Sequence, residues 1–288
     1  MLMTQVEKAR VFRALHERDG AFIIPNPWDA GTARLLAHLG FEALATTSAG
    51  YAFSAGQPDN TIERDEMMAH ISSIAAATDL PVSVDLENGF GDTPEIVGQT
   101  IRLAAAAGAV GGSIEDMSRQ TGHPIYEYEH AVERIRAASE AARALPFPFT
   151  LTARSENYLL GRPDLKDTIK RLQAYQTAGA HVLYAPGLTS KDDIAAVVKS
   201  VDRPVNVVMG LQGVQLSLAE LSAIGVKRVS VGSALSRAAL GAFLRAAREM
   251  KEHGTFAFAD EAVNYAELSA MFAACRSEQE SRRNQTSH

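Results

Sequence analysis

The sequence predicts an α/β fold, a TIM-type (β/α)8 barrel, from three observations. Short apolar runs alternate with helical stretches eight times between residues 20 and 250, and this alternation demands parallel strands. The apolar runs are continuous, as expected for strands that are covered on both faces. The chain has 288 residues, and a single barrel commonly needs about 250. An open doubly wound sheet is the alternative that this pattern leaves.

The expected elements begin with an amphipathic helix over 4–18, which places Val6, Ala9, Phe12 and Leu15 on one face and should pack on, or cap, the main body. Strands are then expected where short apolar runs follow prolines or small residues, at 21–24, 43–46, 81–85, 110–114, 148–153, 181–184, 204–208 and 227–231. An alanine-rich helical stretch follows each of them, at 29–39, 63–77, 94–107, 127–143, 165–178, 191–199, 217–224 and 233–250.

The domain organisation follows from where this alternation stops. Residues 1–250 are expected to form one barrel domain that includes the N-terminal helix, because no composition shift marks a boundary inside 20–250. Residues 251–275 read as a C-terminal helical extension whose apolar surface suggests packing on a neighbouring subunit. Residues 276–288 have no apolar period and are expected to be a disordered tail.

Composition narrows the class of function. Hydrophobic residues make up 46% of the chain, enough for a large core, and the net charge of -6 argues against a nucleic-acid-binding surface. Cys275 is the only cysteine, so no disulfide framework is expected. No signal segment and no run of about 18 apolar residues is found. We therefore expect a soluble, cytoplasmic protein that acts on a small molecule and binds no membrane.

Polar side chains gather at the expected carboxyl ends of the strands, where a barrel carries its functional loops. Asp85 and Glu87 end the third strand on the same side of an extended chain, so they can converge on one hard cation directly or through bound waters. Gly89 and Gly91 would let the backbone turn tightly beside them. With Glu115 after the fourth strand, these acids predict an oxygen-only site for Mg²⁺ or Mn²⁺, because no His or Cys cluster has zinc spacing.

The loops after the second and fifth strands predict a carboxylate-binding site. Arg154 is a planar donor that can form two parallel hydrogen bonds with a substrate carboxylate. The backbone amides of Ser48, Ala49 and Gly50 could hold the same carboxylate or an oxo group. A divalent metal beside such a clamp would stabilise an enolate, the intermediate formed when a bond beta to a carbonyl breaks.

Each motif also has a purely structural interpretation. Arg154 and Glu156 could form a plain ion pair, the acids after the fourth strand could cap a helix, and Thr47 and Ser48 could form a loop turn. The appearance of all these motifs at one end of the barrel favours a functional site.

Five stretches, in order along the chain, read PNPWDA at 25–30, ATTSAG at 45–50, VDLENGFG at 84–91, SIED at 113–116 and ARSE at 153–156. Together they resemble the isocitrate lyase/phosphoenolpyruvate mutase superfamily over about residues 20–250. The resemblance implies a (β/α)8 barrel that forms a homodimer or homotetramer and exchanges its last helices between subunits. It also implies that Asp85 is the principal metal-side carboxylate, with Asp59, Glu87 and Glu115 completing the shell largely through water.

The same resemblance implies the substrate side of the site. Thr47, Ser48 and Ala49 correspond to the loop that holds the carboxylate and keto oxygen of an oxo acid, and Arg154 corresponds to the carboxylate-binding arginine. Asn206 lies near the substrate-side residues of the seventh strand.

The loop after the fourth strand departs from the family pattern. Isocitrate and methylisocitrate lyases resemble one another in a K-[KR]-C-G-H motif, whereas residues 116–124 here read DMSRQTGHP and contain no cysteine. His123 could replace that cysteine as acid or base, or it could be a solvated loop histidine. Tyr126 and Tyr184 are further candidates, although large side chains in barrel loops often only pack.

The function that these residues favour is a Mg²⁺-dependent lyase or decarboxylase, which cleaves a C–C bond in a small 2-oxo-acid-related carboxylate through an enolate. Its catalytic candidates are Arg154, His123 and Glu115. One alternative is a mutase or hydrolase that acts on the P–C bond of phosphonopyruvate. Another is a non-catalytic protein that binds a 2-oxo acid.

Overall fold

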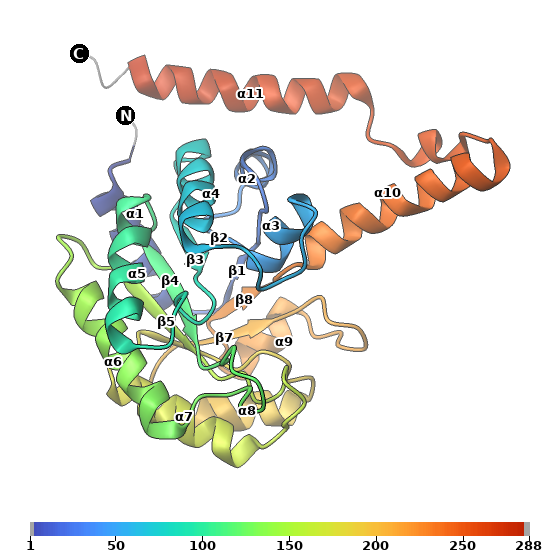
Figure 1. Ribbon diagram of the computed structural model, residues 1–288. Coiled ribbons are helices and arrows are strands. Elements are labelled where there is room, and N and C mark those ends of the chain that lie inside the picture. Colours follow the sequence, from blue (N-terminus) through green and yellow to red (C-terminus); the bar gives the residue numbers. More distant parts are fainter. Residues whose placement is uncertain (1–2, 285–288) are drawn as a thin grey trace.

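The computed structural model describes residues 3–284 and shows eight parallel strands in the order β1-β8-β7-β6-β5-β4-β3-β2, ringed by helices (Figure 1). The predicted barrel is confirmed, and each predicted strand is present. All begin later than predicted, and the fourth and fifth run one residue past their predicted ends. The strands are β1 Phe22–Ile24, β2 Leu44–Ala45, β3 Val82–Asp85, β4 Gly111–Glu115, β5 Thr150–Arg154, β6 Val182–Tyr184, β7 Val205–Val208 and β8 Arg228–Ser230.

The barrel is closed except between β1 and β2, which share no ladder of hydrogen bonds. The Ala45 N–H donates to the Pro25 carbonyl oxygen at 3.0 Å across this seam. Just beyond it, the buried Asn26 side chain donates to the Thr46 carbonyl at 2.9 Å and accepts from the Val231 and Gly232 amides at 2.9 and 3.0 Å. One asparagine therefore ties together the chain segments that follow β1, β2 and β8.

The eight predicted outer helices are also present. They are α2 Ala30–His38, α4 Arg64–Ala77, α5 Pro94–Ala106, α6 Tyr128–Arg143, α7 Leu165–Thr177, α8 Lys191–Lys199, α9 Leu218–Ala223 and α10 Ala234–His253. One more helix, α3 Ser48–Ser54, was not predicted. It has only seven residues, too few to show an apolar period, and the signal for it is Thr47, whose hydroxyl accepts from the Gly50 amide at 3.2 Å and caps the helix.

The leading helix α1, Gln5–Glu17, covers the amino-terminal end of the barrel. Ala9, Phe12 and Leu15 are buried against Phe22 and other residues of the inner strands, as the apolar face predicted. A methyl group at Gly111 would lie 2.8 Å from the Phe12 ring, so a glycine is needed where this helix meets β4.

The chain after residue 250 differs from the expected tail. Helix α10 leads away from the barrel, and a short 3₁₀ turn, η1 Ala257–Glu261, turns the chain back (Figure 1). Helix α11, Tyr265–Asn284, then packs on α2 of the same chain, where Phe272 lies against Gly31. Residues 276–284, for which a disordered tail was expected, are helical in the structure, and 285–288 lie outside the described residues. Exchange of these helices between subunits stays a prediction.

Exposed apolar side chains gather on α10 and just after it, including Phe243 and Phe256, each 66% exposed. No helix in the described part of the chain is both long and apolar enough to cross a membrane.

Candidate active site

A cavity of about 280 Å³ opens at the carboxyl ends of the strands. All the residues predicted to bind substrate contribute to its lining: Thr47, Ser48, Ala49, Asp85, Arg154 and Asn206. Asp59, predicted on the metal side, lines it as well. Strand order explains this convergence, because the carboxyl ends of parallel barrel strands meet on one face.

Asp85 is the acceptor on which most of these contacts converge. Its Oδ2 accepts from the Ser48 hydroxyl at 2.9 Å and from the Ser48 amide at 3.3 Å. Its Oδ1 accepts from Arg154 Nη1 at 3.1 Å, from the Glu87 amide at 3.3 Å and from the Ser113 hydroxyl at 3.4 Å. Five donors therefore hold this carboxylate in one orientation at the mouth of the barrel.

Arg154 binds three carboxylates rather than standing free. Its Nη1 pairs with Asp85 at 3.1 Å, its Nη2 with Glu115 at 3.1 Å and its Nε with Glu156 at 2.9 Å. Burial alone would lower the pKa of Arg154, but these three acids together raise it well above its usual value. The sequence offered two interpretations of Arg154, an ion pair with Glu156 and a position in the substrate site. In the structure Arg154 forms that ion pair and also lines the cavity.

The side chains around Arg154 include more carboxylates than guanidinium groups. Five carboxylates gather here, and among the described residues Arg154 and Arg119 are the arginines that form ion pairs with them: the carboxylates are Asp59, Asp85, Glu87, Glu115 and Glu156. Burial raises the pKa of Asp59, Glu115 and Glu156, and it raises that of Glu87, with help from Asp85, to about 7. Removing charged carboxylates from water costs free energy unless positive charge compensates them.

One carboxylate oxygen of Glu87 is buried without a hydrogen-bond partner among the described residues. Its side chain is 2% exposed, Oε2 pairs with Arg119, and Oε1 has no hydrogen-bond partner within residues 3–284. Its backbone has a φ of +48°, in the left-handed region that favours glycine, because the chain turns sharply before Gly89. An unpartnered, buried carboxylate oxygen next to excess negative charge fits a hard divalent cation.

The distances between the acids limit how a cation could bind. Over the described residues, no three Asp, Glu, His or Cys side chains are grouped closely enough to ligate one ion together. Asp85 could therefore serve as a direct ligand, with Asp59, Glu87 and Glu115 reaching the ion through water.

The loop after β4 gives His123 the position of a solvated loop histidine, one of the two interpretations that the sequence left open. It is pinned by a bridge between Met117 and Ile125, and its Arg119 side chain reaches inward to Glu87. His123 lies at the exposed tip of the loop and does not line the cavity. The position of His123 in the sequence did not fix the direction of its side chain.

The floor of the cavity holds a residue that the sequence reasoning missed. Arg228, 5% exposed, donates from Nε to Asn206 Oδ1 at 2.8 Å and from Nη2 to the Thr152 hydroxyl at 2.9 Å. No carboxylate pairs with it in the part of the chain that the structure describes, and burial lowers its pKa to about 10. The available signal was the charged pair Lys227 and Arg228 at the start of the predicted eighth strand.

Arg228 also fixes the groups around it. Because Asn206 Oδ1 accepts from Arg228, its amide nitrogen must face Ser230, to which it donates at 3.0 Å. Ser230 therefore has its own proton free for Tyr184, with which it forms a hydrogen bond. Burial is the main cause that raises the pKa of Tyr184, to about 12, so its hydroxyl keeps its proton beside the cavity.

Comparison with known proteins agrees with the fold and with the motifs. The family model described as phosphoenolpyruvate phosphomutase matches residues 12–251. A crystal structure from Burkholderia cenocepacia J2315, for which a lyase or mutase activity has been suggested, is 69% identical, covers 93% of this chain and 96% of that chain, and superposes with a TM-score of 0.91.

Two relatives named for an activity are more distant. The 2-methylisocitrate lyase of Aeropyrum pernix is 29% identical over 85% of this chain and 80% of its own length. The oxaloacetate decarboxylase of Chromohalobacter salexigens is 29% identical over 84% of each chain. With the barrel, the acidic cluster and the match over residues 12–251, the chain belongs to the isocitrate lyase/phosphoenolpyruvate mutase superfamily.

Proposed function

We propose that the protein is a Mg²⁺-dependent carbon–carbon lyase that decarboxylates a small 2-oxo dicarboxylate of the oxaloacetate type. The observation that carries this proposal is the lining of the cavity of about 280 Å³, which offers donors for carboxylates but no His, Lys or Cys side chain among the described residues. Its volume suits a compact carboxylate.

The absence of these three side-chain types from the lining bears on the reaction type. A retro-aldol cleavage needs a base that removes a hydroxyl proton, as the cysteine loop of related lyases would allow. The carboxylates lining this cavity are Asp59 and Asp85, and five donors already engage Asp85. Decarboxylation of a 2-oxo-4-carboxylate needs no such base. The C3–C4 bond breaks, CO₂ leaves, and the electron pair moves through C2 onto the oxo oxygen to give an enolate.

The chain's own residues would then bind and orient the substrate. Thr47 and Ala49 line the cavity at the start of α3, and the Thr47 hydroxyl and the Ala49 amide would hold the oxo-acid end there. Arg228 supplies positive charge at the floor, toward the far end of the substrate. A divalent cation bound beside Asp85 would supply positive charge that stabilises the enolate oxygen.

Tyr184 is the group positioned to return a proton. Within residues 3–284 no acceptor is found for the Tyr184 hydroxyl proton, because Ser230 acts as the donor in their hydrogen bond, and the pKa of about 12 keeps Tyr184 protonated at neutral pH. Donation of that proton to C3 of the enolate would complete formation of a 2-oxo monocarboxylate. The oxaloacetate decarboxylase relative, 29% identical, supports this choice of substrate.

The test measures pyruvate release from oxaloacetate with Mg²⁺ and again with excess chelator. Because free Mg²⁺ also promotes this decarboxylation, the Asp85→Ala protein at the same Mg²⁺ concentration gives the background. The same assays are run with 2-methylisocitrate, substituted malates and phosphonopyruvate. Chelator-sensitive pyruvate release above that background supports the proposal.

Other outcomes contradict the proposal in distinct ways. Turnover of 2-methylisocitrate or a malate without oxaloacetate turnover would replace decarboxylation with retro-aldol cleavage. Phosphate release from phosphonopyruvate would indicate P–C chemistry. Saturable binding of oxalate without turnover of any substrate would indicate a binding protein.

A further inference from the structure

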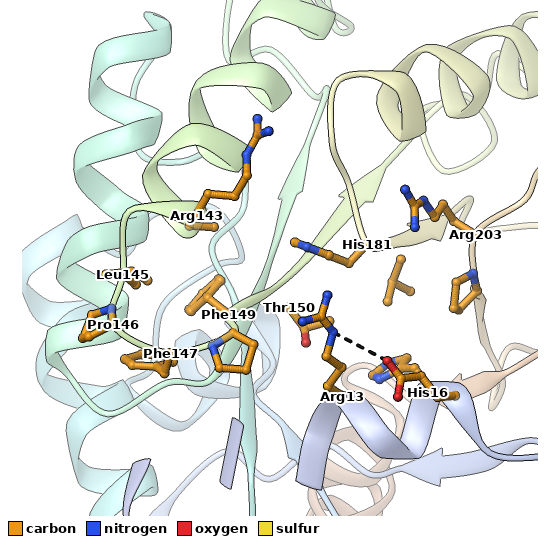
Figure 2. Close-up of a pocket in the computed structure, with 15 residues that line it drawn as sticks. Arg13, His16, Arg143, Leu145, Pro146, Phe147, Phe149, Thr150, His181 and Arg203 are labelled. Atoms are coloured by element: carbon orange, nitrogen blue, oxygen red, sulfur yellow. Dashed lines mark ion pairs between the residues drawn. The ribbon is translucent and has the colours of Figure 1, made fainter. Parts of the chain in front are cut away.

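A second, larger cavity lies at the opposite end of the barrel and shares no lining residue with the first. It measures about 470 Å³ and opens between α1, residues 142–150 and the segments that lead into β6 and β7 (Figure 2). Figure 2 shows apolar residues 145–149 on one side of this cavity and Arg13, His181 and Arg203 on the other.

The lining of this cavity is strongly basic. Arg13 comes from α1, Arg143 ends α6, and Arg203 precedes β7, so three separate elements each contribute a guanidinium group. The one acid in the lining is Glu17, 3.6 Å from Arg13. This excess of positive charge occurs in a chain whose net charge is -6.

The tautomer of His181, which lines the same cavity, is fixed by a backbone hydrogen bond. The Leu151 amide donates to its Nδ1 at 3.1 Å, so Nδ1 carries no proton and the neutral ring must carry it on Nε2. Burial, followed by the charges of Arg13, Arg203 and Arg143, lowers the pKa of His181 to about 4. No acceptor for Nε2 is found among the residues described. The ring thus offers a fixed, neutral N–H beside three cations.

We infer that this amino-terminal cavity is a binding site for a small dianion, either a phosphoryl group or a dicarboxylate. Guanidinium groups bind both through paired N–H donors, and the His181 N–H adds a neutral donor. The lining would repel a metal cation. Phe147, which is only partly buried, offers apolar surface for the carbon skeleton of such a ligand. The site is independent of the proposed reaction, because its donors lie at the other end of the strands.

The two cavities are separated by little more than the contact between His16 and Arg228. His16 lines the amino-terminal cavity, and His16 Nε2 lies 3.4 Å from Arg228 Nη1. Arg228 in turn lines the candidate active site. Binding must therefore be measured with variants that separate the two cavities.

The test is calorimetric titration of the chelator-treated protein, at low ionic strength, with inorganic phosphate, pyrophosphate and succinate. We expect one saturable site for at least one of these probes. The Arg13→Gln/Arg203→Gln protein should bind that probe at least about tenfold more weakly, since it loses charge-assisted hydrogen bonds. Preference for the phosphates or for succinate identifies the natural ligand as a phosphoryl compound or a dicarboxylate.

Two control variants separate binding in this cavity from binding at the surface and from binding in the candidate active site. Arg10→Gln removes an exposed arginine of the same helix that does not line the cavity, and it should leave the affinity unchanged. Asp85→Ala should also bind the probe as the wild type does. In nitrogen NMR, the His181 Nε2 signal should shift on addition of the probe. Equal affinity in wild-type and double-variant proteins, or no saturable binding at millimolar concentrations, would overturn the inference.

Discussion

Asp85 is the residue on which the candidate active site depends most directly. Its two oxygens accept from Ser48, Glu87, Ser113 and Arg154, and we propose it as the residue that would contact the cation directly. We expect Asp85→Ala to lower metal-dependent turnover by more than about 10²-fold, because both the cation and the Asp85–Arg154 ion pair are lost.

The fold should survive this change, since Arg154 keeps Glu115 and Glu156. Steady-state kinetics with Mg²⁺ measure the loss of turnover, and far-ultraviolet circular dichroism checks that the fold is retained. Asp65→Asn, on the exposed first turn of α4, is the matched control. Turnover retained in Asp85→Ala would remove the metal-site argument.

Arg119 and His123 lie on one loop, and the structure predicts different roles for them. Arg119 reaches Glu87, whereas His123 is exposed at the tip. We expect Arg119→Gln to lower kcat by about tenfold, because the loop loses its charged contact with the site and excludes water less well. His123→Gln should change kcat by less than about twofold. If the histidine variant shows the larger loss in kcat, the acid–base role considered for His123 would be restored.

How far the sequence predicted single residues depended on where they sit along a strand. Asp85, Glu115 and Arg154 are the last residues of β3, β4 and β5, so the barrel geometry alone brings them to one face. Arg228 opens a strand, where a charged residue could equally have faced solvent, and its inward direction is decided by Asn206, Thr152 and His16. His123 lies in a loop, where spacing does not fix direction.

Among the elements, the loop after β3 is shaped by groups far from it in sequence. Arg134 of α6 is 1% exposed and donates to the carbonyls of Asn88, Gly91 and Asp92. Its guanidinium also lies 4.1 Å from the centre of the Tyr126 ring. The sequence predicted the tight turn from its glycines, but it could not show that a buried arginine holds the turn in place.

The seam between β1 and β2 yields a prediction about barrel closure. Asn26→Ala would leave the Thr46 carbonyl and the Val231 and Gly232 amides without their partner. Unpaired buried groups cost roughly 1–3 kcal/mol each, and with partial relaxation we expect the free energy of unfolding to fall by about 2 kcal/mol. Urea denaturation measures this loss.

The matched control for this seam is Asn264→Ala, which removes a cap at the start of α11 and should not shift the barrel transition. Equal midpoints for Asn26→Ala and wild type would show that the asparagine does not hold the seam closed.

At the scale of the whole molecule, the exposed apolar surface on α10 predicts self-association. Phe243 and Phe256 are each 66% exposed, and contiguous apolar patches usually mark an interface. We propose a homodimer or homotetramer formed through this surface. Light scattering after size exclusion should show an oligomer for the wild type and a shift toward monomer for Phe243→Ser/Phe256→Ser.

Leu39→Ser is the matched control for self-association, because Leu39 is also 66% exposed but lies at the end of α2. A wild-type protein that remains monomeric at all concentrations would contradict the oligomer. The sequence predicted apolar surface for packing on another subunit in residues 251–275, which include Phe256, and did not predict the exposed apolar side chains of α10.

The backbone of Glu87 has a consequence for attempts to make this protein more heat-stable. A left-handed conformation costs a side-chain-bearing residue about 1–2 kcal/mol, and an unpartnered buried oxygen adds to that cost. Glycine would relieve both, so a screen for thermal tolerance alone should favour Glu87→Gly. The same change would remove a carboxylate from the proposed metal shell. Stability and catalysis would thus compete for one position, and any engineering of this chain would have to select for both at once.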